Sequence, residues 1–130
     1  MKFLKSLFAS SRLLALDSAS IKTFTESWPE IKAYYEVFSK TFHSSEKVNI
    51  EALKSESGLL TERAEALLIE NLPAAYRNPK TIETLLTLKK QTNLVAVLVR
   101  ENSPEAEIKS AAIKLKDTFH AFIDFCLSEK

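Results

Sequence analysis

Histidine and cysteine are the residue types that most readily carry proton-transfer or covalent chemistry near neutral pH, and this chain has three of them: His43, His120 and Cys126. A histidine can act as a general acid or base, and a cysteine thiolate is a nucleophile. Such a group needs a neighbour that activates it, and no serine or cysteine of this sequence has an identifiable base partner. We therefore expect a non-enzymatic protein with no catalytic residues and no small-molecule substrate.

His43 follows Phe42 at the end of a predicted helix, where a histidine can interact with unpaired carbonyl groups. The segment His43-Ser44-Ser45-Glu46-Lys47 is similar to the histidine phosphotransfer family in placing a lysine four residues after a histidine. That family combines a four-helix bundle with an exposed histidine. This segment departs from the family pattern because it has no glycine and lies in a predicted link. A phosphotransfer-like bundle is kept as an alternative, and the sequence identifies no family.

The other two reactive side chains lie on one predicted helix. His120 is one turn from Lys116 and from Asp124, which predicts a solvated or ion-paired surface histidine. Cys126 lies among the predicted core positions, where a thiol behaves as a small inert hydrophobe. Those core positions include no Asp, Glu or His, and the only methionine is Met1. We therefore expect no metal, haem or other cofactor inside the fold.

The elements that must position these residues are predicted helices. Four segments carry mostly apolar residues at alternating steps of three and four, so that each set forms one stripe along a helix. Tyr34 lies off the first stripe and is predicted to be half exposed. The stripes are Ile21, Phe24, Trp28, Ile31, Tyr35, Phe38 and Phe42; Ile50, Leu53, Ser57, Leu60, Ala64, Leu67 and Asn71; Thr81, Leu85, Leu88, Thr92, Val95 and Val99; and Ile108, Ala112, Leu115, Phe119, Phe122 and Cys126.

This spacing predicts an all-α protein, an antiparallel (up-down) four-helix bundle with helices of about 20–26 residues. The single glycine, Gly58, supports helices over sheets, because tight hairpins need residues that tolerate positive φ. Leu94–Val99 has the composition of a buried strand. Its continuity with the stripe before it favours a helix instead.

The predicted helix ends carry capping residues. Ser27-Trp28-Pro29-Glu30 fits a capping box, and Asn78-Pro79 and Ser103-Pro104 each place a cap before a proline. Pro29 either kinks the first long helix or separates a short helix at 18–26 from a longer one. The link Asn102-Ser103 is so short that the last two helices must be antiparallel neighbours, whereas 72–78 is a longer connection.

The N-terminal segment 1–17 is predicted to form an additional amphipathic helix at residues 2–16, outside the bundle at 18–130. Phe3, Leu7 and Phe8 lie on its apolar side. An alternative is therefore a peripheral membrane protein that docks through this helix. Arg12 interrupts the apolar run, which argues against a signal peptide, whereas a transit peptide stays open. We expect a cytoplasmic protein.

The composition limits the class of partner. Hydrophobic residues make up 45% and charged residues 27% of the sequence, as in a folded soluble domain. The net charge of +1 gives no reason to expect nucleic-acid binding.

The predicted helix at 79–101 has more apolar surface than a bundle core requires. A helix that is apolar nearly all round must be covered nearly all round, and large uncovered apolar patches commonly mark interaction sites. We therefore expect a protein–protein interaction or regulatory module of unknown role that is able to self-associate as a homodimer. The candidate interaction surface is Ile82, Leu86, Leu94, Val97 and Leu98, together with Phe3, Leu7 and Phe8.

Overall fold

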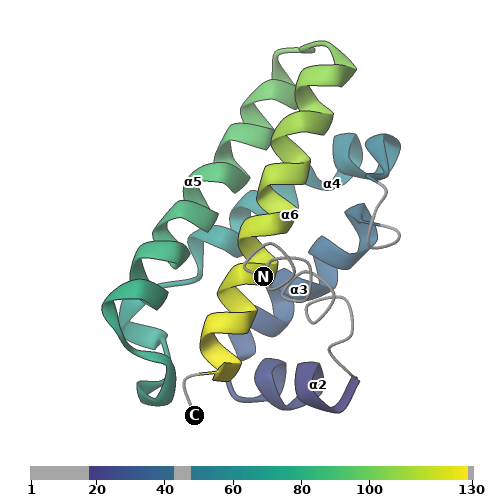
Figure 1. Cartoon of the computed structure of the whole chain (residues 1–130). Helices are drawn as coiled ribbons and strands as arrows, with labels where there is room; N and C mark the ends of the chain where they lie inside the picture. The colour runs from purple at the N-terminus through teal and green to yellow at the C-terminus, as the bar shows by residue number, and fades with distance from the viewer. Residues whose placement is uncertain (1–17, 43–47, 129–130) are drawn as a thin grey trace, which may run out of the picture.

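The computed structural model describes residues 18–42 and 48–128, with side chains described for 22–42 and 48–127. All regular elements in these ranges are helices, which confirms the all-α prediction (Figure 1). The predicted helix at 2–16 lies outside the described residues. The elements are α2 (Ser18–Glu26), α3 (Pro29–Thr41), α4 (Ile50–Glu65), α5 (Pro79–Arg100) and α6 (Glu105–Ser128), with short 3-10 helices η1 (Ile69–Asn71) and η2 (Ala74–Tyr76).

The two long C-terminal helices form the largest packed unit. α5 and α6 lie side by side in Figure 1, and α5 also packs against α4, which in turn packs against α3. The short α2 contacts α3 and α6. Chain neighbours are therefore neighbours in space from α3 to α6.

Pro29 separates two helices, which decides between the two possibilities left open by the sequence. Trp28 takes the N-cap position with an extended backbone (φ −146°, ψ 94°), the conformation that a following proline favours. The predicted capping box is wrong, because Ser27 stands one residue too early. The Ser27 hydroxyl instead donates to the Phe24 carbonyl oxygen at 2.7 Å. Tyr76 Oη lies 3.2 Å from Ser27 Oγ.

α4 is shorter than predicted. It ends at Glu65, whereas the stripe predicts a helix as far as Asn71. Pro73 disfavours helical backbone at the residue before it, and the chain forms η1 and η2 in this connection. Two cations hold the connection: Lys89 Nζ donates to the Leu67 carbonyl oxygen at 3.0 Å, and Arg77 donates to that of Leu72 at 2.8 Å.

The hairpin of α5 and α6 is built as predicted. Asn78 caps α5, because its Oδ1 accepts from the Thr81 backbone N–H at 2.9 Å. Leu94–Val99 is helical. At the other end Asn102 has a φ of 57°, Asn102 N–H donates to the Val99 carbonyl at 3.1 Å, and Ser103 N–H donates to that of Leu98 at 3.0 Å. This pair of bonds is a Schellman motif, which satisfies the last carbonyls of a helix. α6 begins one residue later than predicted, at Glu105.

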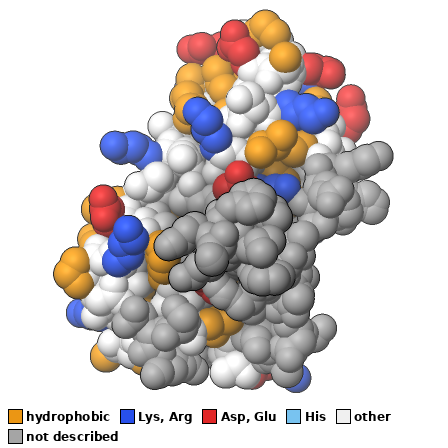
Figure 2. All heavy atoms as spheres, in the orientation of Figure 1, with side chains coloured by type: hydrophobic (Ala, Val, Ile, Leu, Met, Phe, Trp, Pro, Cys, Tyr) orange, Lys and Arg blue, Asp and Glu red, His pale blue; other side chains and the backbone are white. Residues whose placement is uncertain are grey.

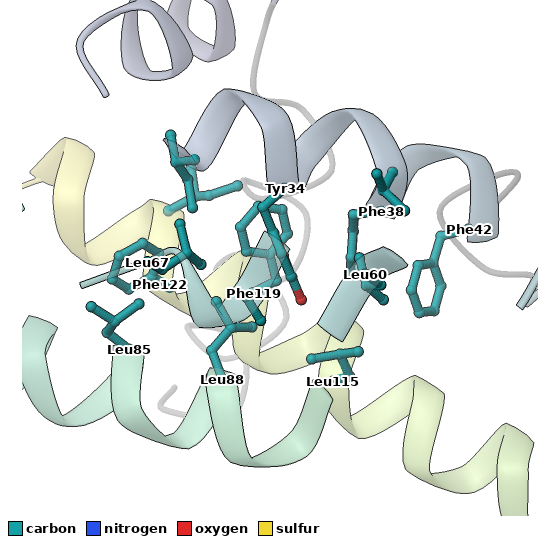
Figure 3. Close-up of a cluster of buried hydrophobic side chains, with 14 of the residues drawn as sticks. Tyr34, Phe38, Phe42, Leu60, Leu67, Leu85, Leu88, Leu115, Phe119 and Phe122 are labelled. Carbon is teal, nitrogen blue, oxygen red and sulfur yellow. The ribbon is translucent and has the colours of Figure 1, made fainter. Parts of the chain in front are cut away.

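The four stripes supply most of the core. The fourth is buried throughout, and the others hold except at a few positions: Tyr35, Ile50 and Val99 are half-buried and Asn71 is exposed. The side chain of Ile21 lies outside the described residues. Figure 3 shows aromatic rings of α3 and α6 meeting leucines of α4 and α5 in this core.

Tyr34 corrects the predicted phase of α3. Its side chain is 0% exposed, not half exposed. The Thr92 hydroxyl donates to the Leu88 carbonyl oxygen at 2.8 Å, so the Tyr34 hydroxyl donates to Thr92 Oγ1 at 2.9 Å. Because α3 starts afresh at Pro29, Ile31, Tyr34, Phe38 and Thr41 define its buried face.

Candidate interaction surface

The candidate surface on α5 is narrower than the sequence predicts. Leu86 and Leu94 are 46% and 49% exposed, while Val97 is half-buried. Ile82 and Leu98 are partly buried and pack against the core, so only part of each side chain is available to a partner. Phe3, Leu7 and Phe8 lie outside the described residues, and the part that they play stays a prediction.

Exposed charges separate the apolar side chains on this face. Glu83, Lys90 and Glu101 are all exposed on or beside α5. Figure 2 shows hydrophobic side chains in separate groups, with Lys, Arg, Asp and Glu side chains between them. The face is thus a mixed surface, which suits contact with another folded protein better than burial in a lipid interface.

A shallow pocket of about 260 Å³ lies between α5 and α6, and the sequence reading missed it. Lys80 Nζ lies 5.6 Å from the centre of the Phe125 ring, and both residues line the pocket. The register of the hairpin is the signal that could have found it. The antiparallel link at Asn102-Ser103 places Lys80 near Phe125, and Thr87 near Thr118.

The pocket lining carries hydroxyl groups and charged side chains. The hydroxyls of Thr84 and Thr87 donate to carbonyls of their own helix, Lys80 O at 2.8 Å and Glu83 O at 3.1 Å. These hydroxyls therefore face a ligand as acceptors. The lining also includes the charged side chains of Lys80 and Glu83, and no histidine or cysteine is among the lining residues.

Two of the three reactive side chains, Cys126 and His120, lie among the described residues. Cys126 is fully buried, and burial raises the pKa of its thiol to about 12, so the thiol stays protonated at neutral pH. His120, predicted to be solvated or ion-paired, has a half-buried side chain. Burial and the positive charge of Lys116 lower the pKa of His120, against the opposing effect of Asp117. His43 lies outside the described residues.

Three exposed hydrophobic side chains were not singled out from the sequence. Leu68 and Ile69 follow α4, and Ile113 lies on α6. The first two lie beyond the end of α4 at Glu65 and are not members of the second stripe, whose Leu67 is buried. All three lie outside the candidate surface as the sequence predicts it.

Within residues 18–42 and 48–128, no group of three or more Asp, Glu, His or Cys side chains is placed to hold a metal ion. In the same part of the chain, every helix is too short or too polar to cross a lipid bilayer. No protein-family model, no curated protein and no solved structure matches this chain.

Proposed function

We propose that this protein is a non-enzymatic helical interaction module, cytoplasmic in location, that self-associates through the outer face of α5. The observation that carries the proposal is the exposure of Leu86 and Leu94, 46% and 49%, on a helix whose other face builds the core. Exposed apolar side chains with charged side chains between them are typical of contact with another folded protein.

The scaffold in this proposal is an up-down bundle of α3, α4, α5 and α6. Successive helices pack against one another. Ring contacts between α6 and α3 support this arrangement. The centre of the Phe119 ring lies 5.2 Å from that of Tyr34 and 4.5 Å from that of Phe38, both on α3. Such a bundle gives α5 one face toward the core and one toward a partner.

The magnitude of the exposed apolar surface argues for weak association. Covering the exposed half of a leucine contributes about 1 kcal/mol, so two leucines from each of two copies contribute about 4 kcal/mol. Association costs at least about 4 kcal/mol in lost freedom of motion. Val97 and the aliphatic part of Lys90 must add to the contact, and we expect a dimer that forms at high micromolar concentration or above.

The test is sedimentation velocity over a concentration series. The wild-type protein is expected to show a rising average mass, and the double variant Leu86→Lys/Leu94→Lys is expected to stay monomeric. Ile113→Lys is the matched control, because it places a charge at an exposed apolar site of α6 and should leave the mass unchanged. Far-UV circular dichroism checks that each variant is folded. A wild-type protein that remains monomeric at millimolar concentration contradicts the proposal.

A further inference from the structure

The outer face of α5 has an internal symmetry about Lys90. Leu86 and Leu94 lie four residues before and four residues after it, and all three side chains are exposed. Four residues advance a helix by roughly 6 Å and turn it by roughly 40° past a full circle. The three side chains therefore form a short ridge with a lysine at its centre and a leucine on either side.

This symmetry matches a second copy of the same helix running in the opposite direction. A two-fold axis through Lys90 places Leu86 of one copy against Leu94 of the other, and does so twice. Leucine then meets leucine at both contacts. Parallel pairing about the same point would place every residue against its own copy.

The charges at the two ends of α5 favour the antiparallel arrangement. Glu101 lies 11 residues after Lys90, and Lys80 lies 10 residues before it, and both are exposed. An antiparallel pair therefore brings Glu101 of each copy near Lys80 of the other. In a parallel pair the same side chains would repel their own copies.

We infer that the partner of this surface is a second copy of the chain, bound in an antiparallel pair of α5 helices with the two Lys90 side chains at the symmetry axis. The inference rests on the proposed self-association and adds its register. The central lysines repel each other, which weakens the pair. A neutral residue at position 90 in both copies, or a negative charge there in one copy only, is expected to strengthen the pair.

Cysteine cross-linking tests the register. Helices packed 8–10 Å apart, with Cα atoms roughly 2.3 Å from each axis, bring facing Cα atoms roughly 4–5 Å apart at the closest approach. A disulfide fits that distance. Lys90→Cys is therefore expected to give a disulfide-linked dimer on mild oxidation. Glu83→Cys, an equally exposed site on the same helix, is the control, because its two copies would lie roughly 20 Å apart along the axis.

Charge reversal gives a second measurement. An equimolar mixture of the wild type and Lys90→Glu is expected to form mixed dimers severalfold in excess of the statistical share, as counted by native mass spectrometry. Cross-linking of Glu83→Cys as readily as Lys90→Cys, or a statistical mixture, overturns the register while self-association stands. A wild-type protein that never dimerises instead overturns the proposed function and this inference with it.

Discussion

The hydroxyl of Thr92 lies between two buried partners, because it accepts from Tyr34 and donates to the Leu88 carbonyl. The hydroxyl of Thr81, on the same helix, is also fully buried but has no hydrogen-bond partner among the described residues. Burying a hydroxyl without a partner costs free energy, whereas a satisfied one is close to neutral or favourable. Two threonines on one stripe therefore have opposite effects on stability.

Replacing each threonine by valine tests this difference. Thr92→Val leaves the buried Tyr34 hydroxyl without an acceptor, and we expect it to lower the free energy of unfolding by about 1–3 kcal/mol. Thr81→Val removes an unsatisfied group of similar shape, and we expect it to raise that free energy by up to about 1 kcal/mol. Urea unfolding followed by circular dichroism measures both. Equal losses in the two variants would contradict this account.

The pKa of His120 predicts a pH dependence of stability. Its pKa lies below the usual value of 6.5 in the folded protein, chiefly because of burial. Between the folded and unfolded pKa values, the unfolded chain binds more protons than the folded one. The free energy of unfolding is therefore expected to fall as pH decreases from about 7 through that window, and to be independent of His120 above it.

The variant His120→Gln separates this effect from the titration of carboxyl groups. Urea unfolding of both proteins at a series of pH values gives the difference in stability directly. That difference should shrink as pH decreases through the window, because only the wild type has an imidazole at position 120 to protonate. A difference that is the same at every pH would show that His120 has no depressed pKa.

At this scale the sequence predicts burial well where a stripe is continuous and poorly where a helix restarts. Phe24, Phe38 and Phe119 are buried as expected. Tyr34 and Tyr35 exchange roles, because the phase of α3 follows from Pro29 and from the rings that α6 presents. Periodicity alone carries no information about that partner helix.

The helical hairpin of α5 and α6 depends on the backbone conformation of Asn102. A φ of 57° is the left-handed region, which costs most residues roughly 1–2 kcal/mol and costs glycine almost nothing. Asn is tolerated there more readily than other residues. The turn is therefore a place where one substitution acts on a whole element.

We expect Asn102→Gly to raise the free energy of unfolding by about 0.5 kcal/mol, and Asn102→Val to lower it by about 1–2 kcal/mol. Thermal unfolding monitored by circular dichroism measures both. Asn93 is exposed within α5, and Asn93→Gly is the matched control. It should destabilise, because glycine is unfavourable inside a helix. A gain from glycine at both positions would mean that the turn geometry is not the cause.

The sequence predicts some helix ends correctly and others wrongly. The start of α5 at Pro79 follows from Asn78, a cap whose side chain bonds within its own turn. The end of α4 does not follow, because Leu67 stays buried beyond Glu65 and keeps the apolar spacing after the helix has stopped. In the connection after α4, the carbonyl oxygens of Leu67 and Leu72 accept hydrogen bonds from Lys89 and Arg77, which come later in the chain.

In the molecule as a whole, aromatic rings join α3, near the start of the described chain, to α6, its last helix. Phe119 lies near the rings of Tyr34, Phe38 and Tyr35, the last at 6.2 Å between centres. It is fully buried. Its side chain therefore supports contacts that no other single residue of α6 replaces.

Phe119→Ala is expected to cost about 3–5 kcal/mol, a large part of the total stability of about 5–15 kcal/mol typical of a domain. Phe119→Leu keeps more of the volume and should cost less. Urea unfolding measures both. If the loss is less than about 1 kcal/mol for Phe119→Ala, the rings are not packed as described.

The candidate surface shows how far sequence reasoning reaches at this scale. It correctly marks α5 as a helix with apolar residues beyond its core face, and Leu86 and Leu94 are exposed. It includes Ile82 and Leu98, which pack against the core, and misses the pocket beside Phe125. Both depend on how α6 lies against α5, which a one-helix pattern does not contain.

The hydrogen bond at the tip of the hairpin also bears on how the protein ages chemically. An asparagine followed by a small residue deamidates when the next backbone nitrogen attacks the side-chain amide carbon and releases ammonia. At Asn102 that nitrogen belongs to Ser103, and its N–H is already held by the Leu98 carbonyl at 3.0 Å. Intact helical structure thus shields this site, and deamidation during storage should begin only in molecules whose hairpin tip has opened.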